Sequence, residues 1–201
     1  MRRRTLLVSL TLLTTLACAA CGSGSKPPAQ STLRGTVLSP PTDAPGFTLR
    51  DQANRAVSLR GERGHYVVVT FLYTHCPDVC PVIAGNLNLA LASGAGRRAR
   101  LRVLAVSVDP ARDTLTAVRR YVVRHRLLPT FHYLIGARTS LARVWREYHV
   151  AASAGPRATV SHTAFELLID PRGRERLAYD STVRAAWLEH DLDVLARQSS
   201  S

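Results

Sequence analysis

The stretch YTHCPDVCP, residues 73–81, holds the two residues of this chain that are best suited to chemistry. Cys76 and Cys80 stand four positions apart, and a proline follows each of them. A deprotonated cysteine sulfur is both a nucleophile and a strong ligand for soft metal ions. The pair can therefore cycle through a disulfide or hold a metal ion, and the spacing alone does not decide between these uses.

The segments on either side of the cysteines predict how they are positioned. The continuous apolar run at residues 66–73 indicates a central strand that is buried on both faces. Residues 79–94 predict a helix that ends at Gly94, with apolar residues at every fourth position. Cys76 then lies in the turn after the strand and Cys80 in the first turn of the helix. The helix dipole and the unpaired N–H groups there favour thiolates.

The remaining segments alternate between strand and helix patterns. A hairpin is expected at 47–65 and a second one over 161–180. Strands are expected at 101–109 and 131–136, and helices at 115–126, 139–150 and 184–198, with a loop at 151–160. Asp113 and Thr114 are expected to cap the helix at 115–126. The pattern predicts an α/β protein with a thioredoxin-like fold, an N-terminal β-hairpin and helices on both faces of the sheet.

The N-terminal region predicts a secreted, membrane-attached protein. A basic start and an uncharged, mostly apolar stretch make residues 1–20 a signal peptide. Cys21 opens a Gly/Ser/Pro-rich segment typical of a bacterial lipoprotein, so residues 21–34 are expected to be a lipidated tether and 35–198 the folded domain. Cys18 is a weaker candidate for the lipidated residue, and an ordinary cleaved signal is a further alternative. Either way the domain lies outside the cytoplasm.

The formal net charge of +13 does not indicate nucleic-acid binding. Of the 27 basic residues 26 are arginines, which are scattered along the chain without an aromatic-rich basic stripe. A solvated basic surface is the simpler interpretation, and it would also attract anionic lipid headgroups.

A metal site would need ligands beyond the two cysteines. Structural zinc sites take four ligands, usually from two close Cys/His pairs, whereas the seven histidines stand singly at positions 65, 75, 125, 132, 149, 162 and 190. Two thiolates and one imidazole suit copper instead. The residues leave the third ligand open, although His162 differs from the others because it follows a Gly/Pro-containing loop and opens an apolar strand.

The chain resembles the Sco (SenC) family of copper-binding proteins over nearly the whole expected domain. The resemblance rests on FTLRDQ (47–52), FLYTHCPDVCP (71–81), AVSVDPARDT (105–114) and VSHTAFELLIDPRG (160–173). It implies that Cys76, Cys80 and His162 bind copper, as Cu(I) or Cu(II). It also implies a protein anchored outside the cytoplasm that helps to load the dinuclear copper centre of cytochrome c oxidase subunit II.

Three functions are consistent with these residues. The first is a copper chaperone, which is not an enzyme in the usual sense. The second is a thiol–disulfide oxidoreductase whose Cys76 and Cys80 reduce the cysteines of the oxidase copper site, with another copper carrier or a thiol reductant as a further partner. The third is a thiol peroxidase, and the second cysteine together with His162 argues against it.

Overall fold

The centre of the fold is the strand β4 (Val67–Leu72), whose six residues are all buried. The computed structural model describes residues 33–151 and 165–199, which lie within one unit spanning Leu33–Ser201. Branched and aromatic side chains pack well on both faces of a sheet, so the apolar run becomes the innermost strand. The central strand predicted at 66–73 is thereby confirmed, with one residue fewer at each end.

Six strands form the main sheet in the order β1-β8-β7-β4-β5-β6. The other five are β1 (Thr36–Val37), β5 (Arg102–Ser107), β6 (Phe131–Leu134), β7 (Phe165–Ile169) and β8 (Glu175–Asp180). β5 and β6 run parallel to β4, whereas β7 is antiparallel to it. The carboxyl ends of β4, β5 and β6 therefore meet at the edge of the sheet where β7 begins.

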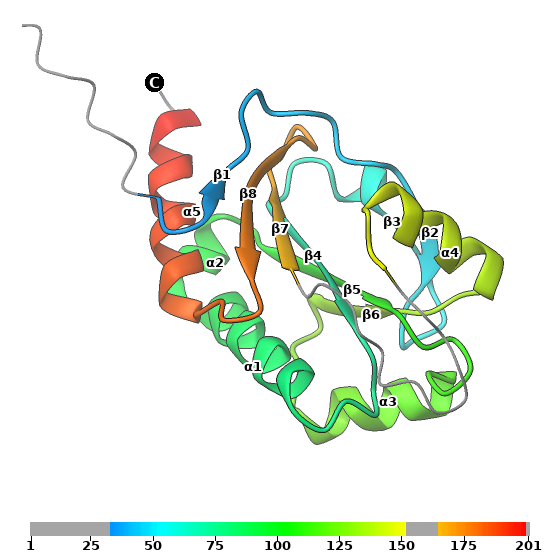
Figure 1. Cartoon of the computed structure of the whole chain (residues 1–201). Coiled ribbons are helices and arrows are strands. Elements are labelled where there is room, and N and C mark those ends of the chain that lie inside the picture. Colours follow the sequence, from blue (N-terminus) through cyan, green and yellow to red (C-terminus); the bar gives the residue numbers. More distant parts are fainter. Residues whose placement is uncertain (1–32, 152–164, 200–201) are drawn as a thin grey trace, which may run out of the picture. The chain divides into compact units, whose positions relative to one another are not determined.

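Helices cover both faces of this sheet (Figure 1). One face carries α1 (Val79–Ala92), α2 (Gly94–Arg98), α3 (Leu115–Arg124) and α5 (Ala185–Ser199). The other carries α4 (Arg138–Glu147), beside which Tyr148 packs its ring 5.7 Å from that of Phe71 in β4. The predicted thioredoxin-like α/β fold is confirmed.

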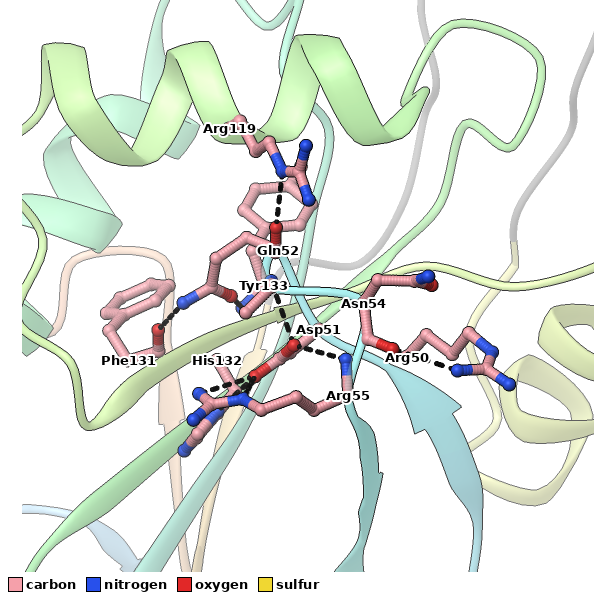
Figure 2. A network of polar contacts seen from close by, with 10 residues as sticks. Arg50, Asp51, Gln52, Asn54, Arg55, Arg119, Phe131, His132 and Tyr133 are labelled. Atoms are coloured by element: carbon pink, nitrogen blue, oxygen red, sulfur yellow. Dashed lines mark hydrogen bonds and ion pairs between the residues drawn. The ribbon is translucent and has the colours of Figure 1, made fainter.

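The predicted N-terminal hairpin consists of β2 (Thr48–Arg50) and β3 (Ala56–Ser58), and it is fastened to the outer strand β6 (Figure 2). The Gln52 side chain donates to the Phe131 carbonyl at 3.0 Å and accepts from the Tyr133 N–H at 2.9 Å. The fully buried Asp51 carboxylate lies 3.3 Å from the ring of His132. His132 is therefore partly buried and engaged with Asp51.

Two short elements are absent from the sequence prediction. α2 is Gly-rich, and it forms because the Ser93 hydroxyl accepts the Gly96 N–H at 2.9 Å. A Cβ on Gly96 would lie 2.0 Å from the Ala90 carbonyl oxygen, so only glycine permits this close approach to α1. β1 has two residues and exists only through its pairing with β8. Tertiary contacts, rather than local propensity, create both elements.

Several predicted features lie outside the described residues: the signal peptide with Cys18, most of the tether with Cys21, most of the 151–160 loop, and His162. In the part of the chain that the structure does describe, there is no helix with both the length and the apolar character needed to cross a bilayer.

Candidate metal and redox site

The two cysteines lie where the sequence predicts, between the end of β4 and the start of α1. The chain turns after Leu72, and the Cys76 N–H closes this turn on the Tyr73 carbonyl at 3.3 Å. Cys80 is the second residue of α1. Its backbone N–H donates to the sulfur of Cys76 at 3.4 Å, and both thiols are free. The two side chains thus share one site at the carboxyl edge of the sheet.

The Cys76 sulfur takes part in capping α1. Asp78 occupies the N-cap position, but its exposed side chain makes no capping hydrogen bond. Burial raises the pKa of Cys76, but hydrogen bonds from the Cys80 thiol and from the N–H groups of Cys80 and Asp78 outweigh this effect. The net shift lowers the pKa of Cys76, as expected for a thiol at a helix N-terminus.

Cys80 lies in a different environment. It is fully buried, whereas Cys76 is 8% exposed. Burial raises the pKa of Cys80, and its hydrogen bond to Cys76 raises it further. The site therefore pairs one slightly exposed cysteine, whose pKa is lowered, with one fully enclosed cysteine, whose pKa is raised.

Tyrosines form the wall around the thiols. Tyr73 hydrogen-bonds to Cys76, and burial together with this contact raises the pKa of Tyr73 to about 12. The buried Tyr121 hydroxyl has no hydrogen-bond partner among the residues that the structure describes. Beneath them, the Tyr133 ring packs 5.4 Å from that of Tyr121. This apolar wall keeps bulk water from the sulfurs and strengthens electrostatic interactions there.

Asp113 fastens the cysteine turn to the sheet, and this corrects its predicted role as a helix cap. Thr114 alone caps α3, by accepting the Ala117 N–H at 3.2 Å. The Asp113 carboxylate is buried and accepts from both the N–H and the hydroxyl of Thr74, at 2.9 and 2.7 Å. It also accepts from the hydroxyls of Ser107, at 2.6 Å, and Tyr133, at 3.2 Å.

Asp113 therefore joins the turn two residues before Cys76 to the ends of β5 and β6. Burial raises the pKa of this carboxyl, although its four hydrogen bonds oppose the shift. Sequence spacing could not reveal this role, because Thr74 and Asp113 lie 39 positions apart. The only available signal was a short acidic side chain placed directly after a buried strand and a turn.

The described histidines do not complete a metal site with the cysteines. His75 is exposed, and its ring hydrogen-bonds to the Thr74 hydroxyl at 3.0 Å. His65 pairs with Glu62 at the opposite end of β4. Within residues 33–151 and 165–199 there is no group of three or more potential metal-binding His, Cys, Asp or Glu side chains.

The start of β7 lies close to the cysteine edge. The ring of Phe165, its first residue, lies 5.6 Å from that of Phe71, which is five positions before Cys76. His162 precedes Phe165 by three positions and lies outside the described residues.

The SCO1/SenC family model matches residues 38–196, which is nearly the whole described domain. The chain belongs to the SCO1/SenC family. A curated family relative, the mitochondrial SCO2 homolog of Bos taurus, is 32% identical over 162 residues. That match covers 77% of this chain but only 59% of the relative's length.

Solved SCO1/SenC structures share the fold. The structure of Bradyrhizobium japonicum ScoI with copper bound is 29% identical, has a TM-score of 0.65, and is matched over 76% of this chain and 98% of that one. BsSco is described as a member of the Sco family of cytochrome c oxidase assembly proteins, with a disulfide switch. At 19% identity and a TM-score of 0.65, covering 80% of this chain and 96% of that one, BsSco supports the fold alone.

Proposed function

We propose that this SCO1/SenC protein is an extracytoplasmic copper chaperone. It binds one copper ion, as Cu(I) or Cu(II), through the thiolates of Cys76 and Cys80 and the imidazole of His162. It then delivers the ion to the copper centre of cytochrome c oxidase subunit II. The observation that carries the proposal is the pair of adjacent free thiols at the N-terminus of α1.

The donor set fits copper better than other metals. Thiolates are soft ligands that favour Cu(I), and two thiolates with one imidazole suit three-coordinate copper geometry. Because Cys76 already accepts two backbone N–H groups, part of its negative charge is stabilised before any ion arrives. Copper bound to the Bradyrhizobium japonicum relative supports the same cargo here.

The position of β7 supports His162 as the third ligand. Phe165 contacts Phe71 at the cysteine edge, and three extended residues span at most about 11 Å. His162 is therefore tied to a point near the end of β4 by a short piece of chain. Of the other histidines, His75 adjoins Cys76 in the chain, but it is exposed and its ring hydrogen-bonds to the Thr74 hydroxyl at 3.0 Å.

The N-terminal residues supply the location in this proposal. Residues 1–20 direct export, Cys21 carries the lipid, and residues 21–34 tether the domain 35–198 to the membrane. The 12 positions between Cys21 and Leu33 span at most about 43 Å when extended, which keeps the site within reach of a membrane-embedded oxidase.

The asymmetry of the two thiols favours a second candidate function, the reduction of a disulfide in the oxidase copper site. The Cys76 thiolate would attack one sulfur of the target disulfide, and a target thiolate would leave. Cys80 would then lose its proton and attack the Cys76 sulfur, which releases the second target thiolate. Two electrons pass to the target, and the Cys76–Cys80 disulfide needs an external thiol reductant before the next cycle.

Copper titration of the reduced full chain tests the proposal. We expect one Cu per chain by metal analysis, with either Cu(I) or Cu(II), and loss of this stoichiometry in C76S, C80S and H162A. H162A should still form the Cys76–Cys80 disulfide. If H162A supports oxidase assembly at low copper as well as the wild type does, the reductase function is the main one.

A further inference from the structure

A pocket beside the cysteine turn gathers positive charge. Its volume is about 170 Å³, and it is lined by Thr74, His75, Ala117, Arg120, Tyr121, Arg124 and His125. We refer to it as the α3 pocket. Thr74 and His75 come from the turn before Cys76, and the other five residues come from α3 and its C-cap. Two guanidinium groups and two imidazoles therefore face the same hollow.

The arginines of the α3 pocket have no counter-charge. Arg120 and Arg124 are exposed, and neither side chain forms an ion pair or a hydrogen bond within residues 33–151 and 165–199. α3 contains no acidic residue in its ten positions. Some other arginines of the described residues are paired with carboxylates, such as Arg98 with Asp193 at 2.8 Å and Arg174 with Asp170 at 2.9 Å.

The positive charge of α3 affects the pKa of His125. Burial lowers the pKa of His125, and the neighbouring positive charge of Arg124 lowers it further. The ring of His125 also packs 4.2 Å from that of Tyr121, and Tyr121 lies near enough to the thiol site for Cys80 and Cys76 to raise its pKa. The α3 pocket and the cysteine site thus share one wall.

α3 also offers apolar surface next to these charges. Val123 is 77% exposed, the largest value among the exposed apolar side chains of the described residues. Protein interfaces commonly combine a small apolar centre with charged groups around it. Val123 is the chain neighbour of Arg124, which lines the α3 pocket.

We infer that the α3 pocket receives carboxylate side chains from an acidic surface of the protein that exchanges copper or electrons with Cys76. This inference rests on the proposed function for the identity of what is exchanged. Opposite charges steer encounter and fix the orientation of two proteins, which a transfer between two small sites requires. A protein rather than a free anion is favoured because the pocket directly adjoins the transfer site and an exposed apolar side chain.

The test uses the full chain in detergent and a fluorescent octaglutamate peptide as probe, with octaglutamine as the uncharged control. The variant R120E/R124E reverses the charge of the α3 pocket. R143E/R146E is the matched control, because both arginines are exposed on α4, on the opposite face of the sheet. Copper stoichiometry is measured for each variant in parallel.

We expect R120E/R124E to weaken octaglutamate binding at least about tenfold and R143E/R146E less than about twofold, with copper stoichiometry unchanged in both. Binding should also weaken as salt rises from about 0.05 M to about 0.3 M. Equal effects of the two variants would show attraction by net charge alone and would overturn the inference. Loss of copper in R120E/R124E would overturn it as well, because the pocket would then belong to the metal site.

The last measurement adds inorganic phosphate, or chloride at the same ionic strength, as a competitor of the octaglutamate peptide. If phosphate displaces the peptide where chloride does not, the pocket is a small-anion site and protein docking is overturned. If the wild type binds no copper but keeps pocket-dependent peptide binding, the proposed function fails while the docking surface stands.

Discussion

At the scale of single residues, the difference between Cys76 and Cys80 determines how the site reacts. Both sulfurs are free and adjacent, but one is partly accessible at a helix N-terminus and the other is enclosed by the core. A thiolate is the reactive form of cysteine, so accessibility and a lowered pKa act in the same direction at Cys76. Both act in the opposite direction at Cys80.

Alkylation should therefore be ordered. With limiting iodoacetamide at neutral pH, we expect Cys76 of the reduced full chain to be modified first and Cys80 to follow only on unfolding. The rate of alkylation at Cys76 should rise with pH over a range that lies below the usual range of a thiol, since the folded-state pKa of Cys76 is lowered. Peptide mass spectrometry over time measures both sites. Faster labelling of Cys80 in the folded protein would contradict the assignment.

Asp113 should matter as much as the cysteines for holding the site together. All four of its contacts are with donors, and an asparagine offers one acceptor oxygen in place of two. We expect D113N to lose about 1–3 kcal/mol of unfolding free energy and to weaken copper binding. Denaturant unfolding and copper titration measure the two effects. D43N is the control, because Asp43 is exposed; equal stability of D113N and D43N would refute the role.

At the scale of elements, β7 contains a carboxyl group that opposes stability at neutral pH. Glu166 is fully buried, and one carboxyl oxygen lies 3.4 Å from the Thr70 hydroxyl, whereas the other has no partner among the described residues. Burial raises the pKa of Glu166 to about 8. In the unfolded chain a glutamate ionises near pH 4.3.

Stability should consequently fall as pH rises between these two values, because the unfolded state releases a proton that the folded state retains. Glu166 alone should lower the free energy of unfolding by up to about 1.4 kcal/mol for each pH unit in this range. We expect E166Q to flatten the pH dependence of the unfolding midpoint between about pH 5 and pH 8, relative to the wild type. An unchanged profile would show that Glu166 is ionised in the folded state.

The elements differ in how far they could be predicted from sequence. β4, β5 and α1 could be predicted because their apolar patterns are long and each pattern fits one period. α2 could not, since glycine weakens a helix and only the Ser93 cap and the packing of Gly96 against Ala90 hold it. The role of Asp113 could not be predicted either. A helix cap is a local feature, whereas the contacts of Asp113 join the carboxyl ends of three different strands.

At the scale of the whole molecule, the proposed lipid anchor sets where the site can act. We expect C21S to leave the membrane fraction and C18S to remain in it, because Cys21 is the proposed lipidated residue. Membrane fractionation followed by detergent-phase partitioning measures both variants. Release by C18S alone would assign the lipid to Cys18, and retention of both single variants would refute the lipid anchor.

The candidate site was predictable to different extents. Cys76 and Cys80 could be placed from local sequence, since a buried strand followed by a helix fixes the junction between them. The proposed role of His162 depended on the family resemblance, because it requires β7 to pair antiparallel with β4, a contact that joins distant parts of the chain. The α3 pocket was not foreseen, since its lining residues come from two segments about 45 positions apart.

The carboxylate of Asp113 has one more consequence. It holds the cysteine turn in place through hydrogen bonds within the protein, so the fold itself positions two of the three proposed ligands. Domains that fold around a structural metal, such as zinc fingers, collapse when a chelator removes it. This domain should instead keep its cooperative melting transition in a copper chelator, losing only the extra stability that bound ligand adds by mass action. A carrier built in this way can give up its cargo and remain folded for the next load.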